Sequence, residues 1–460
     1  MVYVSARKPE TIVFIAAFSA FLATFNETFL NVAFSPIMDN LGVGVSTVQW
    51  LATAYMLGAA VMVPVSAFLY RSVPTKCLYL ISVGLLVAGS VIGALAVNFP
   101  MLLVGRIVQA IGTGMLIPIG MNITLEVAQK RKLGTYMGIM GAMTTLGPSS
   151  SVIVAGVLLS FFNWHMLFWV FTALSAICFI CGVCLLSNVA ELTHPKLDLA
   201  STIQVGFALI GILYGVSTIF SGNILIALIA IVVGILCLIA FIARQNKLSE
   251  PLINLRPLSV KPFAIGVIIN MISLVVIFAM NIVIPVFMQS ALEASALDSS
   301  LTLFPAILLS CVVSPIAGRV YDRYGVKALL PLGFVLICVC TFALALAKNT
   351  GSPVLLAALY IPVICGSALI IGPVQSFALS FLTPELNPHG VTVMSTGFQI
   401  AGCIGSSLFS GVYSLSAAPS NGFTAASLLA AVFALGGFFL ALYVRRLEKR
   451  KMVMAVVTRD

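Results

Sequence analysis

The stretch GRVYDRYGVKALLPLGFVLICVCTFALALA, residues 318–347, joins a short basic segment to 20 residues that carry no charge. A helix needs roughly 20 mostly apolar residues to cross the hydrocarbon core of a bilayer, and residues 328–347 have that length. Apolar runs alternate with short charged loops in the same way along the rest of the chain. The pattern therefore predicts an all-α polytopic membrane protein.

The composition of the 460 residues supports this class. Hydrophobic residues make up 61% of the chain, charged residues only 8%, and the mean hydropathy is +1.17. Soluble domains carry about a quarter charged residues, so the composition excludes a water-soluble enzyme. The net charge of +10 is spread over many loops, so we expect contacts with membrane lipid and no nucleic-acid partner.

Charges, prolines and glycines divide the apolar sequence into fourteen predicted spans. Their ranges are 12–35, 47–70, 76–97, 101–123, 133–160, 164–186, 201–221, 223–243, 262–289, 300–320, 328–347, 353–382, 390–416 and 422–444. If the N-terminus is cytoplasmic, the even number of spans makes the C-terminus cytoplasmic too. All of the 23 lysines and arginines except Arg106 and Lys348 then lie on the cytoplasmic side, as the positive-inside rule requires.

Two longer loops, residues 187–200 and 245–261, separate the seventh and eighth spans from two groups of six. We therefore predict a 6+2+6 organisation: an N-terminal bundle (1–186), a two-helix insert with its linkers (187–261), a C-terminal bundle (262–444) and a cytoplasmic tail (445–460). An internal repeat supports the duplication. SAFLYRSVPTK (66–76) and GRVYDRYGVK (318–327) are both short basic loops that follow the second span of a six-span group.

The second of these loops resembles the GxxxDRxGxK signature of the major facilitator superfamily, with matches at Gly318, Asp322, Arg323, Gly325 and Lys327. Further segments resemble the fourteen-span drug:proton antiporters of that family, nearest to the lincomycin-resistance-type multidrug exporters. They are NETFLNVA (26–33), QWLATAYML (49–57), GRIVQAIGTG (105–114), LGP (146–148), PLINLRPL (251–258) and HGVTVMSTGFQIAG (389–402). The resemblance covers nearly the whole chain. It implies the major facilitator fold, a place in the bacterial plasma membrane, and export of amphipathic or cationic drugs in exchange for protons.

The resemblance also implies which residues open and close the transporter. Asp322 and Arg323 belong to the gating loop, and Gly147 with Pro148 begins the GPxxGG motif of the antiporters. Here that motif continues as Ser149–Ser151. This departure leaves a second function open, the proton-coupled export or import of an endogenous metabolite or lipid. A third possible function is a membrane sensor that binds a ligand without transporting it. The lack of a soluble output domain in the sequence disfavours this function.

Glu27 is the one acidic residue that falls well inside a predicted span. A rise of 1.5 Å per residue places Glu27 roughly 22 Å from the cytoplasmic face, about 8 Å below the outer face. Arg106 lies at about the same depth in the fourth span, by the same rise. In the fold that the resemblance implies, both spans line the central cavity, so the two side chains can share it.

An ionisable residue inside the membrane is a functional candidate by default. Burial favours the neutral form of a carboxyl group and a nearby arginine favours the charged form, so the two effects oppose each other. We expect Glu27 and Arg106 to couple proton entry to drug release: deprotonated Glu27 attracts the drug, and protonation releases it outward. The alternative is a structural pair in which each buried group satisfies the other.

Polar residues of the spans are less specific candidates for substrate binding. They are Asn26, Asn31, Tyr55, Gln109 and Gln399. Interhelical hydrogen bonding is the alternative role for each. The sequence contains no catalytic set, no metal-ligand spacing and no GxxxxGK[ST] phosphate loop. We therefore expect a transporter and not an enzyme. We expect this transporter to work as a monomer without a cofactor and to draw its energy from a proton gradient.

Overall fold

The computed structural model describes residues 9–189, 192–193, 198–220, 223–248, 251–349, 351–416 and 418–457, and in these ranges all regular structure is helical. Within these ranges, fourteen segments are long and apolar enough to cross a membrane, and each predicted span falls on one of them. The prediction of an all-α, fourteen-span fold is confirmed. Residues 190–191, 194–197 and 249–250 of the predicted linkers, and 458–460 of the predicted tail, lie outside the described ranges.

The spanning helices follow one another with short connections. They are α1 (Pro9–Thr28) continued by η1 (Phe29–Ala33) and α2 (Phe34–Leu41), α4 (Trp50–Ser72), α5 (Thr75–Ala94), α6 (Phe99–Val127), α7 (Leu133–Phe161), α8 (His165–Leu185), α9 (Leu199–Thr218), α10 (Ile224–Gln245), α12 (Lys261–Ala291), α13 (Ala296–Tyr324), α14 (Leu329–Leu346), α15 (Pro353–Leu379), α16 (Asn387–Ser414) and α17 (Pro419–Val457). Short helices lie between them: α3 (Val45–Val48), η2 (Lys130–Lys132), α11 (Arg256–Ser259) and η3 (Ala347–Asn349).

The chain divides into two compact units. Unit 1 comprises residues 1–128, 143–255 and 391–399, and unit 2 comprises residues 129–142, 256–390 and 400–460. The 6+2+6 division predicted from the sequence remains a prediction.

Capping side chains mark where several helices begin. Asn98 accepts a hydrogen bond from the backbone N–H of Met101 at 2.9 Å at the start of α6, and Ser295 and Ser352 cap α13 and α15 in the same way. Such a cap satisfies an N–H that has no partner inside the helix. At the other end of α13, Gly325 adopts a φ of 73°, a conformation that glycine reaches without steric cost.

In unit 1, α6 is the central helix, and α1, α4 and α5 pack against it. Glycines allow α5 and α6 to approach closely. A Cβ at Gly89 would lie 2.6 Å from the carbonyl oxygen of Gly105 and from Cγ of Gln109. Because side-chain bulk is absent at this crossing, residues 105–109 of α6 are drawn into the interior of the unit.

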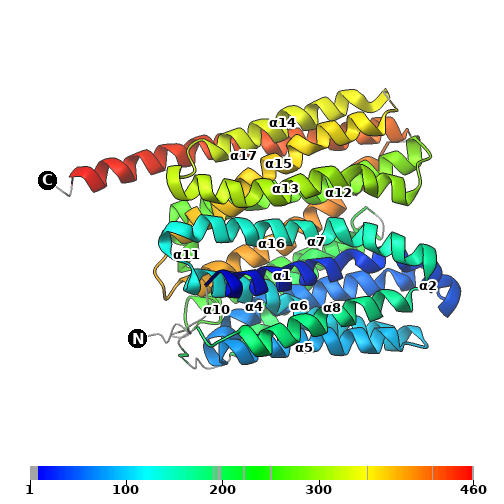
Figure 1. Ribbon diagram of the computed structural model, residues 1–460, viewed down its shortest axis with the longest axis horizontal. Coiled ribbons are helices and arrows are strands. Elements are labelled where there is room, and N and C mark those ends of the chain that lie inside the picture. The colour runs from blue at the N-terminus through cyan, green and yellow to red at the C-terminus, as the bar shows by residue number, and fades with distance from the viewer. Residues whose placement is uncertain are drawn as a thin grey trace. The chain divides into compact units, whose positions relative to one another are not determined.

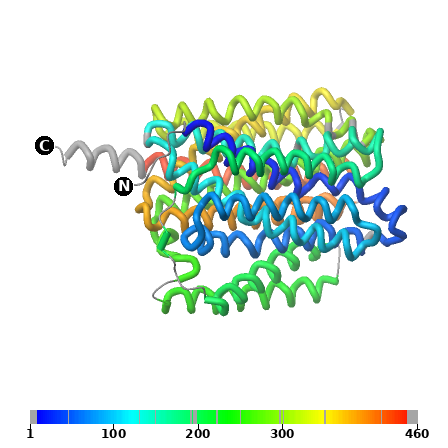
Figure 2. The backbone as a smooth tube through the Cα atoms, turned by 60° about the horizontal axis from the view of Figure 1, so that its bottom comes forward, coloured from blue at the N-terminus to red at the C-terminus, as the bar shows by residue number. Residues whose placement is uncertain are grey.

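The helices α9 and α10 also belong to unit 1 and run side by side along the lower edge of Figure 2. Gly211 and Gly234 meet at their crossing, and Trp50 of α4 stacks on Tyr214 of α9 with ring centroids 6.3 Å apart. An ion pair joins their ends, from Arg244 Nε to Asp198 Oδ2 at 2.7 Å. Arg244 holds the pKa of the Asp198 carboxyl well below its usual range.

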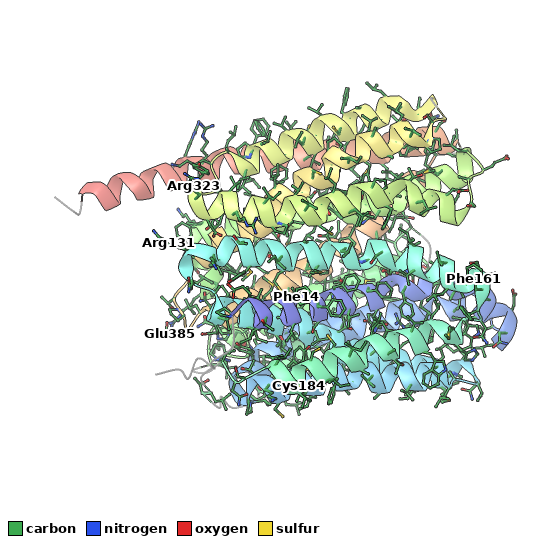
Figure 3. All side chains as sticks on the ribbon, viewed as in Figure 1. Phe14, Arg131, Phe161, Cys184, Arg323 and Glu385 are labelled. Atoms are coloured by element: carbon green, nitrogen blue, oxygen red, sulfur yellow. The ribbon has the colours of Figure 1, made fainter. Side chains whose placement is uncertain are left out.

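In unit 2, α15 packs against α12, α13 and α14, and α17 packs against α12 and α14 (Figure 1). Gly333 and Gly366 form the close contact between α14 and α15. Arg131, Arg323 and Glu385 all lie at one end of this unit (Figure 3). The sequence predicts that this end faces the cytoplasm.

We expect the C-terminus to be cytoplasmic, because the reverse orientation would move almost every lysine and arginine to the outer face. A green fluorescent protein fused after residue 460 should fluoresce. An alkaline phosphatase fused directly after Lys348, whose loop is predicted to lie outside, should be active. Phosphatase activity at the C-terminus would contradict the orientation.

Candidate functional site

Arg106 is the charged residue around which the candidate site is built. It lies on α6, and 0% of its surface is exposed. Removing an arginine from water is costly unless its N–H groups find acceptors. The neighbours of Arg106 should therefore be arranged to supply them.

Four hydrogen bonds hold the guanidinium. Nη1 donates to the carbonyl oxygen and to Oδ1 of Asn26, both at 3.1 Å, and to Oε1 of Gln109 at 3.0 Å. Nε donates to the carbonyl oxygen of Leu51 at 3.3 Å. All four acceptor atoms belong to neutral groups, so none of these hydrogen bonds pairs the guanidinium with an opposite charge.

An aromatic ring covers the face of the guanidinium. Cζ of Arg106 lies 4.0 Å from the ring centroid of Tyr55, a cation–π distance, and the Tyr55 hydroxyl is hydrogen-bonded to Thr113 Oγ1 at 2.5 Å. Gln109 is oriented from its other end, because its Nε2 donates to Ser90 Oγ at 2.8 Å. The charge of Arg106 is thus fixed in position by α1, α4, α5 and α6 together.

The first span is interrupted next to this contact. The carbonyl oxygen of Asn26 accepts from Arg106, and three residues later, at Phe29, the chain passes from α1 into the 3₁₀ helix η1. Short 3₁₀ segments inside helices often mark sites of functional movement. Glu27 lies in this last turn of α1.

The carboxyl group of Glu27 is largely inside unit 1, yet its Oε2 atom has no hydrogen-bond partner among the described residues. The same is true of Nη2 of Arg106. The two groups that the sequence predicted to share a cavity therefore both keep an unused polar atom. The coupling role and the alternative of a structural pair therefore both stay predictions.

The structure brings together three of the predicted substrate residues, Asn26, Tyr55 and Gln109, because all three contact Arg106. Asn31 lies apart from them, exposed on η1. Gln399 is buried on α16, and its Nε2 has no partner among the described residues.

Gly147 and Pro148 lie against α1 within unit 1. A Cβ at Gly147 would overlap Oγ1 of Thr24 and lie 2.8 Å from the backbone nitrogen of Phe25. One turn further, the hydroxyl of Thr28 is hydrogen-bonded to Ser151 Oγ at 2.7 Å. The proline-containing part of α7 therefore packs on the turn of α1 that carries Asn26 and Glu27.

Asp322 of α13 caps the start of α7 within unit 2. Its carboxylate accepts from the backbone N–H of Gly134 at 2.7 Å, and from the N–H and hydroxyl of Thr135 at 2.9 Å and 2.7 Å. A negative charge at a helix N-terminus is stabilised by the exposed N–H groups and by the helix dipole. Arg323 is exposed, and its guanidinium lies 5.2 Å from the ring centroid of Tyr324.

Sequence reasoning missed Thr113, Ser90 and the carbonyl of Leu51 as parts of the Arg106 network. Thr113 follows Gln109 by four residues, so the two side chains lie on the same helix face. This spacing could have indicated Thr113 from the sequence alone. Ser90 and Leu51 come from other helices, and their approach depends on the glycine crossings described above.

Comparison with known proteins identifies the family. The model of the Major Facilitator Superfamily matches residues 16–406. The chain belongs to this family. The lincomycin resistance protein LmrB of Bacillus subtilis is 33% identical over 396 residues, which cover 85% of this chain and 82% of that protein.

Two further likenesses cover almost the full length. The uncharacterized MFS-type transporter YcnB of Bacillus subtilis is 30% identical over 96% of both chains. The solved structure of the proton:xylose symporter XylE aligns with a TM-score of 0.65 at 14% identity, covering 94% of this chain and 96% of that one. The last likeness shows the facilitator fold alone. Together with the fourteen apolar helices, the family makes this chain a multi-pass transporter of the bacterial plasma membrane.

Gly147→Ala should destabilise the protein by about 1–3 kcal/mol, because the new methyl group forces apart a tightly packed contact between α7 and α1. Gly436→Ala is the matched control, since a Cβ at Gly436 meets nothing within 4 Å. Thermal unfolding of the purified variants in detergent measures both effects. Equal melting temperatures for the two variants would contradict the close packing.

Asp322→Asn should cost about 0.5–2 kcal/mol, because the amide cannot accept at both oxygen positions and carries no charge for the α7 N-terminus. The control is Asp39→Asn, which alters an exposed acid near the end of the first spanning segment. Thermal unfolding again provides the measurement. An unchanged melting temperature for Asp322→Asn would show that this cap contributes nothing to stability.

Proposed function

We propose that this transporter is a secondary active multidrug exporter that exchanges amphipathic, cationic drugs for protons by alternating access. The observation that carries the proposal is the buried Oε2 atom of Glu27, which has no hydrogen-bond partner in the part of the chain that the structure describes. Glu27 follows Asn26, which binds Arg106. An ionisable group at such a place is retained against a large desolvation cost, which favours a functional role.

Glu27 can bind a proton and a cationic drug alternately. When it is charged, it attracts a cationic drug into the space beside it, and when it is protonated, that attraction is gone and the drug leaves. Arg106 opposes the binding of a second positive charge and favours the charged form of the carboxyl. Because neutral acceptors hold Arg106 in place, its charge stays fixed while that of Glu27 changes.

The aromatic and amide groups around Arg106 suit a broad range of ligands. We assign Tyr55, Asn26 and Gln109, which surround Arg106, to contacts with a substrate beside Glu27. We assign Asn31 and Gln399 to substrate contacts as a further part of this proposal. The relatives named for lincomycin resistance favour a drug as the cargo. The proton gradient supplies the energy, and we propose that a single chain is the working unit.

Two elements are suited to the movement that exchange requires. Pro148 removes a backbone hydrogen bond from α7, where Gly147 touches the turn carrying Glu27, so a change at Glu27 can bend this helix. The bonds from Asp322 to the start of α7 can break and re-form as the cytoplasmic end opens. We therefore propose Gly147 and Pro148 as a bend point and Asp322 with Arg323 as the gating loop.

Transport into inside-out proteoliposomes with an acidic lumen tests the proposal. Wild-type protein should accumulate the fluorescent cation ethidium as long as the gradient lasts. Glu27→Gln should reduce this accumulation to the level of liposomes without protein, because the glutamine cannot exchange a proton.

Asp39→Asn is the matched control, since Asp39 is an exposed acid twelve residues further along the same span. It should transport like the wild type. Gradient-driven accumulation by Glu27→Gln would overturn the role of Glu27. Failure of the wild type with several cations would instead favour a neutral or anionic metabolite as cargo.

A further inference from the structure

Thr28, the last residue of α1, bonds its hydroxyl to another helix. A threonine inside a helix commonly donates to a carbonyl in the preceding turn of its own helix. Thr24 does so, because its hydroxyl donates to the carbonyl oxygen of Ala20 at 3.1 Å. The hydroxyl of Thr28 instead lies 2.7 Å from Oγ of Ser151 on α7 and 3.4 Å from the carbonyl oxygen of Pro148.

The direction of these hydrogen bonds follows from the number of hydrogens. Ser151 donates its hydroxyl hydrogen to the carbonyl oxygen of Pro148 at 2.7 Å. A hydroxyl has one hydrogen and two lone pairs, so Oγ of Ser151 accepts from Thr28. The side chain of Ser151 is buried. A single chain of bonds therefore runs from the end of α1 to the proline of α7.

This contact is in register with the glycine contact between the same helices. Gly147 of α7 meets Thr24 of α1. Four residues further along both helices, Ser151 meets Thr28. The two contacts thus hold one full turn of α1 against one full turn of α7. Glu27 belongs to that turn of α1.

The helix on the other side of this contact is shared by the two units. Residues 133–142 of α7 belong to unit 2, and residues 143–161 belong to unit 1. Asp322 holds the start of α7 within unit 2. A movement that begins at this end can travel along α7 and reach the turn of Glu27 through the bond between Ser151 and Thr28.

Ser151 occupies a place where the GPxxGG pattern has glycine. The pattern begins at Gly147, so its fifth position is residue 151. A glycine there has no side chain and could not bond to Thr28. The serine of this chain therefore supplies a link between α7 and α1 that the glycine of the pattern cannot supply.

We propose that Ser151 is a positioning residue for proton exchange, because through the Thr28 hydroxyl it holds the turn of Glu27 against α7. The proposal rests on the proposed export function and names the bond that joins Glu27 to the moving helix. While the bond is made, Glu27 and α7 change position together. Without it, α7 moves whether or not Glu27 has exchanged its proton, and the gradient drives less drug.

Two measurements in inside-out proteoliposomes separate this role from a merely structural one. Accumulation of ethidium against its gradient requires proton exchange, whereas exchange of ethidium for ethidium at equal pH on both sides does not. Ser151→Ala and Thr28→Val should each slow gradient-driven accumulation about twofold to tenfold, which corresponds to one hydrogen bond. Both variants should keep the wild-type rate of exchange at equal pH.

The double variant Ser151→Ala/Thr28→Val should accumulate ethidium no more slowly than either single variant, because both single changes remove the same bond. Ser151→Gly restores the glycine of the pattern and should lose as much accumulation as Ser151→Ala, since it too lacks the hydroxyl.

Thr28→Ser and Ser150→Ala are the matched controls. Thr28→Ser keeps the hydroxyl at the end of α1. Ser150 is the neighbour of Ser151, but its hydroxyl donates within α7, to the carbonyl oxygen of Leu146 at 2.7 Å. Both controls should transport like the wild type.

Wild-type accumulation by Ser151→Gly or by Thr28→Val would overturn the role of this bond. So would an equal loss of accumulation and of exchange at equal pH, or effects of the two single variants that simply add. These outcomes differ from failure of the export function itself. In that case the wild type would accumulate no ethidium, and both proposals would fall together.

Discussion

Lipid offers the peptide backbone no hydrogen-bond partner, so a chain that crosses the membrane must satisfy its N–H and C=O groups within its own helices. Each polar side chain inside the spans then has to find a partner among other side chains or among carbonyls that the helices can spare. Arg106 depends on this constraint most strongly. Its guanidinium is fully buried, and it takes two backbone carbonyls, from Asn26 and Leu51, together with two side-chain oxygens.

The cost of burying Arg106 explains the form of its surroundings. Four helices of unit 1 contribute to the network, and glycines at the α5–α6 crossing bring Gln109 to the depth at which Ser90 can orient it. The first span changes from α-helix to 3₁₀ helix at Phe29, three residues after the Asn26 carbonyl that accepts from Arg106. Glu27 stands in the same turn, so the residue proposed to exchange protons lies where the helix is already irregular and where α7 makes its contact through Gly147.

Most of the fold was predictable from the sequence because hydropathy and charge act along the chain. Fourteen apolar runs, separated by short loops, gave fourteen spans, and the facilitator family followed from local motifs such as GRVYDRYGVK. The pairing of Glu27 and Arg106 by depth was a prediction of the same kind. What the sequence could not reveal was which groups Arg106 binds, because that depends on the rotation of each helix and on close approaches at glycines. Asn31 illustrates the limit: it lies four residues after Glu27 along the chain, but it is exposed on the 3₁₀ helix η1.

The central claim is that a drug and a proton compete for Glu27, and proton release on drug binding tests it most directly. Purified protein in weakly buffered detergent solution, at a pH where part of the carboxyl is protonated, is mixed with ethidium in the presence of a pH-sensitive dye. The account predicts that the wild type releases protons in proportion to the drug bound. Glu27→Gln, which resembles the protonated carboxyl, should bind ethidium more weakly and release no protons on the binding that remains. Proton release of equal size from both proteins would contradict the account, because another group would then carry the proton.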